Sequence, residues 1–82
     1  MLRYIHDRIT VDPNLCSGRP TIRGHRVSVQ TILEFLAAGD SPEEILEDFD
    51  FLEPEDIRAC QQFAMQMALD ALSNRTYLPL AA

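Results

Sequence analysis

Apolar positions in the first third of the chain are spaced for short strands rather than for a helix. Ile9–Val11 alternates as a strand does and ends at the turn-forming residues 12–14. Further on, Gly24-His25 separates two short arms, residues 21–23 and 26–27. Because glycine suits the first central position of a two-residue type II′ turn, the pattern predicts a small β-hairpin.

From residue 28 onward, the spacing changes to the three-and-four repeat of amphipathic helices. Ser28 is a suitable N-cap for a first helix, and Gly39 suits its C′ position. Ser41 can cap a short second helix, because Glu44 completes a capping box. A third helix is expected from residues 53–56, where acids suit the positive end of the helix dipole. Its apolar residues are Ile57, Cys60, Phe63, Ala64, Met67, Ala68, Leu69, Ala71 and Leu72, and Asn74 is the expected stop.

These elements predict a mainly α fold with a small N-terminal β-hairpin, in which three helices form a trihelical, homeodomain-like helix-turn-helix. The 82 residues are enough for one domain. We divide it into a basic hairpin region (1–27), a three-helix region (28–73) and an apolar tail (74–82). A small core and an open edge at Ile9–Val11 predict a homo-oligomer, most simply a dimer.

Charge is distributed unevenly along the chain. The formal net charge is −6, and every cation is arginine. Residues 1–33 hold five arginines and two acids, a balance of +3, whereas residues 34–82 hold two arginines and eleven acids, a balance of −9. Such asymmetry suggests two faces with different partners.

The best candidate for nucleic-acid contact is the group Arg19, Arg23 and Arg26. Arginine pairs bidentately with phosphate or guanine, and a two-stranded ribbon fits the major groove. The alternative is that these arginines pair with acids of the helices, for example Glu34 or Asp40. The third helix is a poor reader of DNA, because its first turn is acidic.

The inventory of reactive side chains predicts no catalytic site, no metal site and no cofactor. His6 and His25 stand at no informative spacing from a serine or cysteine, and Cys16 and Cys60 fit two free thiols. The acids of the second helix fit a solvated face. Without an apolar run of about 18 residues or a signal peptide, we expect a cytoplasmic protein with no membrane contact.

The apolar tail is the candidate for contact with a protein partner. Tyr77, Leu78 and Leu80 follow the last predicted helix and can order on a partner's groove or sheet edge. The acidic remainder of the chain would complement a basic partner. The alternative is a tail that packs on its own third helix or on a dimer mate.

One longer motif carries a family resemblance. The motif is Gly18-x-Pro20-x-Ile22-x-Gly24-x-Arg26-Val27-x-Val29, and a helical part follows it up to Ala59. The spacing of glycine, proline and arginine is the part of this pattern that is specific to a family. The chain resembles the bacterial family called domain of unknown function 433 over roughly residues 5–70. Glu53 stands where a threonine-type cap is common in that family.

The resemblance implies a prokaryotic, non-enzymatic, dimeric helix-turn-helix protein, similar to VapB-like antitoxins that pair with a PIN-like toxin. Our first hypothesis is therefore an antitoxin that binds its toxin and, in addition, promoter DNA. The alternatives are a stand-alone DNA-binding regulator and a structural adaptor that uses the acidic helices.

Overall fold

The strand predicted in the N-terminal third is the centre of a small antiparallel sheet. β2 (Ile9–Val11) lies between β1 (Arg3–Tyr4) and β3 (Thr21–Ile22) in the computed structural model, in which residues 1–73 are described. A 3-10 turn, Cys16–Gly18, lies between β2 and β3. The prediction that β2 has an open edge is wrong, because β1 and β3 pair with it on its two sides.

The tight turn after β3 is centred one residue earlier than predicted. The amide of His25 donates a hydrogen bond to the carbonyl of Ile22 at 2.8 Å. The central residues, Arg23 and Gly24, have φ angles of 47° and 75°. Two positive φ angles are characteristic of a type I′ turn, rather than the type II′ turn that glycine in first place suggested. The second arm of the predicted hairpin is reduced to one bridge between Thr21 and Ser28.

The three predicted helices are present. They are α1 (Val29–Ala37), α2 (Pro42–Asp48) and α3 (Pro54–Ser73). Ser73, the last residue given for α3, is also the last described residue. Ser28 caps α1 as predicted, since its hydroxyl accepts a hydrogen bond from the Thr31 amide at 3.1 Å. The fold is therefore mainly α, with a three-stranded sheet where a hairpin was expected.

The predicted capping box begins α2. The hydroxyl of Ser41 accepts a hydrogen bond from the Glu44 amide at 3.1 Å, and the Ser41 amide donates to the Glu44 carboxylate at 2.8 Å. Just before it, Gly39 has a φ of 105° and follows the C-cap of α1. A left-handed residue at this position suits glycine, so the sharp link between α1 and α2 is encoded locally.

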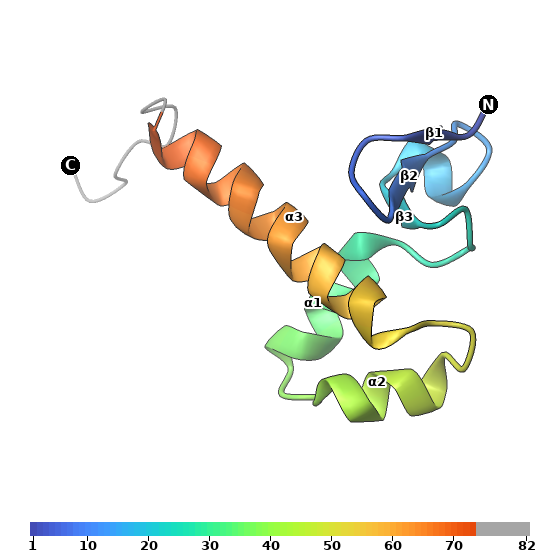
Figure 1. Ribbon diagram of the computed structural model, residues 1–82, viewed down its shortest axis with the longest axis vertical. Helices are drawn as coiled ribbons and strands as arrows, with labels where there is room; N and C mark the ends of the chain where they lie inside the picture. The colour runs from blue at the N-terminus through green and yellow to red at the C-terminus, as the bar shows by residue number, and fades with distance from the viewer. Residues whose placement is uncertain (74–82) are drawn as a thin grey trace.

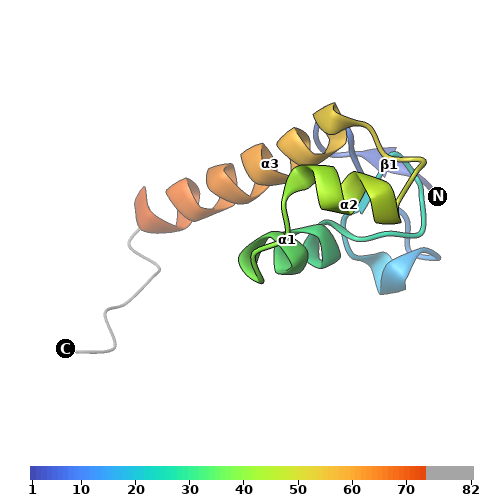
Figure 2. The same ribbon diagram turned by 90° about the horizontal axis from the view of Figure 1, so that it is seen from below.

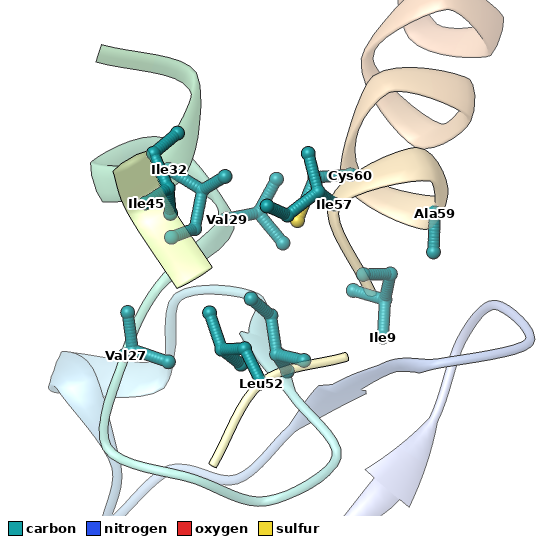
Figure 3. Packing of buried hydrophobic residues seen from close by; sticks show 10 residues of the cluster. Ile9, Val27, Val29, Ile32, Ile45, Leu52, Ile57, Ala59 and Cys60 are labelled. Carbon is teal, nitrogen blue, oxygen red and sulfur yellow. The ribbon is translucent and has the colours of Figure 1, made fainter. Parts of the chain in front are cut away.

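The core lies where the sheet meets the three helices. Each of five elements contributes one isoleucine that is at most 2% exposed: Ile9, Ile22, Ile32, Ile45 and Ile57. Figure 3 shows Ile32 and Ile45 on one side of this core and Ile57 with Cys60 on the other. Burying such a side chain contributes roughly 1.5–3 kcal/mol, so these residues hold the sheet against the helices.

Only the first half of α3 belongs to this core. Ile57, Ala59 and Cys60 are buried, whereas Met67 is 59% and Leu69 49% exposed. In Figures 1 and 2, the second half of α3 projects beyond the sheet and the other two helices. The apolar sequence of α3 therefore continues past the part of the domain that can bury it.

Candidate functional site

A buried carboxylate joins the N-terminal sheet to the start of α3. Asp56 is fully buried, and its oxygens accept hydrogen bonds from the Arg23 guanidinium at 2.9 and 2.7 Å. Arg8 donates to the same carboxylate at 2.9 Å and to Glu53 at 2.6 Å. The Glu53 amide completes the set at 2.8 Å. Asp56 thus caps α3 and holds two arginines from separate parts of the sheet region.

Electrostatics keeps this group ionised. Burial alone would raise the pKa of Asp56, but the hydrogen bonds from Arg23, the Glu53 amide and Arg8 outweigh it and lower the pKa to about 2. The hydrogen bonds to Glu53 and Asp56 likewise raise the pKa of Arg8, and the hydrogen bond to Asp56 raises that of Arg23. The cluster is a permanent set of charges at neutral pH, with a structural role.

This cluster separates Arg23 from the other predicted DNA-contacting residues. The Arg23 guanidinium also donates to the Phe51 carbonyl at 3.1 Å, so three of its hydrogen bonds are made within the protein. The alternative of pairing with helix acids therefore holds for Arg23, although the partner is Asp56 instead of Glu34 or Asp40. Sequence reasoning missed Arg8 and Asp56; the excess of arginine before residue 33 and of acid after it was the available signal.

Arg19 and Arg26 are brought together at a different place. Both are exposed, and both line a pocket of about 370 Å³ with Ser28 and Thr31 at the start of α1. Within residues 1–73, neither arginine forms an ion pair with an acid. Two guanidinium groups beside a helix N-terminus form a positive surface that suits an anion such as phosphate.

The second half of α3 is apolar on two opposite faces. An inner stripe, defined as Phe63, Ala64 and Met67, continues the side of α3 that faces the core. An outer stripe, defined as Met65, Leu69 and Leu72, lies on the other side at helical spacing. At 3.6 residues per turn they together span an arc of roughly 240°, much wider than the seam of a coiled coil. A helix that is apolar over most of its circumference is typical of a buried position, yet all three outer residues are 49–61% exposed.

The inner stripe forms one wall of a groove. Phe63, Ala64 and Met67 line it from α3, Val29 lines it from the start of α1 and Pro20 from the position before β3, in a volume of about 460 Å³. The groove is open and almost entirely apolar, and Arg19 and Gln30 are the polar residues of its lining. It is a surface for an apolar side chain or helix rather than for a polar substrate.

The histidines and cysteines considered in the sequence analysis have the following surroundings in the structure. His6 packs edge-on against Phe63 with ring centroids 5.9 Å apart, and His25 packs against Phe51 at 4.6 Å. Cys16 and Cys60 are free thiols. Across residues 1–73, no three histidine, cysteine or acidic side chains gather as metal ligands would, and no helix there is long and apolar enough to cross a membrane. Tyr77, Leu78 and Leu80, the residues predicted to contact a protein partner, lie outside the described residues.

Comparison with known proteins places this architecture in a family. The family model described as "Protein of unknown function (DUF433)" matches residues 9–64, so the chain belongs to the DUF433 family. The sequence resemblance is thereby confirmed at family level. A crystal structure of a DUF433 member from Anabaena variabilis has the same fold, with a TM-score of 0.72 and 24% identity, and covers 87% of this chain and 70% of that one.

A second relative shows that such a domain also occurs in a longer chain. "Uncharacterized protein y4eO" from Sinorhizobium fredii is 38% identical over 56 residues. The match includes 68% of this chain but only 25% of that protein. The chain therefore spans about a quarter of the length of the curated relative that it matches.

Proposed function

We propose that this protein is a non-catalytic, antitoxin-type module that binds a basic, PIN-like toxin through the outer stripe of α3. The observation that carries the proposal is the exposure of Met65, Leu69 and Leu72 on a helix that projects from the domain. Contiguous exposed apolar surface is typical of protein-interaction sites. A projecting amphipathic helix fits the recognition mode in which a helix lies in a partner's groove.

Charge supports a basic partner. Glu43, Glu44, Glu47 and Asp48 of α2 are exposed, and residues 34–82 carry a balance of −9. A nuclease that grips RNA needs a positive surface, and complementary charge speeds association with such a surface. The apolar tail, with Tyr77, Leu78 and Leu80, would extend the same contact beyond α3.

The test is co-expression with the product of the neighbouring reading frame, followed by co-purification and a growth assay. The variant Leu69→Asp with Leu72→Asp should lose the complex and the protection of growth, because two charges enter an apolar contact. Gln62→Asp, which changes an exposed polar residue of the same helix, is the matched control. Truncation after Asn74 tests the tail separately. Retention of the complex by the Leu69/Leu72 variant would refute the role of the outer stripe.

The pocket of Arg19 and Arg26 favours a second candidate function, contact with promoter DNA in the same protein or in a stand-alone regulator. Two exposed arginines at the start of α1 suit two backbone phosphates. The acids at the start of α3 oppose DNA less than the sequence suggested, since Glu53 and Asp56 are paired with arginines.

This candidate is tested by Arg26→Ala in a DNA-binding titration over a range of salt. Loss of one phosphate contact should weaken binding and reduce the salt slope by about 1. Arg58→Ala, an exposed arginine of α3, is the control and should leave the slope unchanged. Arg23 is unsuitable as a probe, because its removal disturbs the Asp56 cluster. Equal slopes for Arg26→Ala and wild type would exclude this contact.

A further inference from the structure

The core-facing side of α3 follows a heptad repeat that runs out of the domain. Ile57, Cys60, Ala64, Met67 and Ala71 are separated by 3, 4, 3 and 4 residues, the spacing of a helix-helix seam. Ile57 and Cys60 are covered by the protein's own core. At Met67, which is 59% exposed, the same seam continues along the projecting part of the helix.

Each chain consequently presents two complementary features. One is the apolar groove beside Phe63 and Ala64, which is open along the body of the domain. The other is the inner side of the projecting helix, because α3 extends past α1 (Figure 2). The groove has the shape and polarity to accept a helix, and the projecting helix carries the apolar residues that suit such a groove.

We propose that a second copy of this chain fills the groove, so that two α3 helices pack antiparallel about a two-fold axis near Met67. A two-fold contact uses the same patch on both copies, so each projecting helix would lie in the groove of the other. This arrangement buries both grooves at once. It leaves the outer stripe facing away from the pair, and therefore free for the partner suggested above.

Charge distinguishes a second copy from an arbitrary apolar occupant. An antiparallel pair centred on Met67 places residue 70 of one copy opposite residue 64 of the other. Arg19 lines the same groove as Ala64 and has no ion pair among residues 1–73. Asp70 is exposed, and its carboxylate accepts a 2.9 Å hydrogen bond from Gln66 on the same helix. The proposed register therefore brings Asp70 of the second copy toward Arg19, twice per dimer.

The first experiment measures the mass of the full chain in solution by light scattering and sedimentation at micromolar concentrations. The wild type should have twice the 9.3 kDa chain mass. Met67→Asp should have the mass of one chain, because it puts a charge at the centre of the contact. Leu69→Asp, on the outer stripe, is the matched control and should remain dimeric. A monomeric wild type, or dissociation by Leu69→Asp but not by Met67→Asp, would overturn the proposal.

The second experiment tests the register with two exposed residues whose substitution leaves the core intact. Arg19→Asp and Asp70→Arg should each weaken dimerisation by about tenfold, since like charges then face one another. The double variant restores opposite charges and should return the dissociation constant to near the wild-type value. Additive weakening in the double variant would exclude this pairing.

The two proposals fail independently. If Met67→Asp abolishes the dimer while the toxin complex persists, dimerisation is supported without bearing on toxin binding. If Leu69→Asp with Leu72→Asp binds the toxin normally while the wild type is dimeric, the proposed function fails and the dimer stands. Circular dichroism of each variant verifies that the helices are retained.

Discussion

Arg23 and Asp56, 33 residues apart, form a bidentate ion pair with N···O distances of 2.9 and 2.7 Å. The arginine stands in the type I′ turn after β3, and the aspartate is in the first turn of α3. Because the Asp56 side chain is fully buried, the pair fixes the orientation of α3 relative to the sheet. The direction in which the second half of α3 leaves the domain depends on this contact.

Asp56→Asn should therefore destabilise the fold by about 3 kcal/mol, since it removes the buried charge that balances two half-buried guanidinium groups. Urea unfolding followed by circular dichroism measures the change. Glu55→Gln alters an exposed acid in the same helical turn and should change stability by less than about 0.5 kcal/mol. Similar unfolding midpoints for the two variants would show that the cluster contributes little.

Stability should also fall in acid because of the same carboxylate. Asp56 has a pKa of about 2 in the folded protein, below the roughly 3.9 of an unfolded chain. Its contribution, about 2 kcal/mol, is therefore present above pH ~4 and is lost as pH falls from ~4 toward ~2. Urea unfolding over this range should show a smaller pH dependence for Asp56→Asn than for wild type. Parallel curves would contradict the assignment.

The capping box of α2 offers a local test. Ser41→Ala removes the acceptor for the Glu44 amide and should cost about 1 kcal/mol. Glu47→Gln lies in the same helix, is exposed and belongs to no cap, so it serves as the control. Thermal unfolding measures both, and an unchanged midpoint for Ser41→Ala would mean that packing of Ile45 alone holds the helix.

The two thiols should react at very different rates. Burial, with a smaller effect from the charge of Asp56, raises the pKa of Cys60 to about 12, so almost no thiolate is present at neutral pH. Cys16 is only partly buried. Iodoacetamide should modify Cys16 in the folded protein and Cys60 only after unfolding in urea, as read by mass spectrometry of peptides. Equal rates in native buffer would show that the core opens readily.

Local signals predicted most of the helical structure. Ser28, Gly39 and the Ser41/Glu44 box act through hydrogen bonds and backbone angles within three or four residues, and each lies where its sequence position suggested. The strand at Ile9–Val11 was visible for the same reason. The pairing of this strand could not be predicted, because β1 and β3 have only two residues each and show too little alternation of apolar and polar residues to be recognised as strands.

The roles of the arginines in the candidate site could not be predicted from local signals. Arg19, Arg23 and Arg26 look equivalent in sequence, yet Arg23 is joined to Asp56 while Arg19 and Arg26 line one surface pocket. The one-residue shift of the turn contributes to this separation, since it places Arg23 at the first central position. A partner 33 residues away cannot be recognised from spacing alone.

The sequence by itself determined the three helices, their caps, the free thiols and the family, because these follow from short-range patterns of hydrogen bonding, polarity and motif spacing. Only the tertiary structure decided which arginines are structural and where burial of α3 ends. Both depend on how the sheet packs on the helices: a buried charge needs its partners brought from distant positions, and the sheet and α1 are too short to cover a helix of 20 residues.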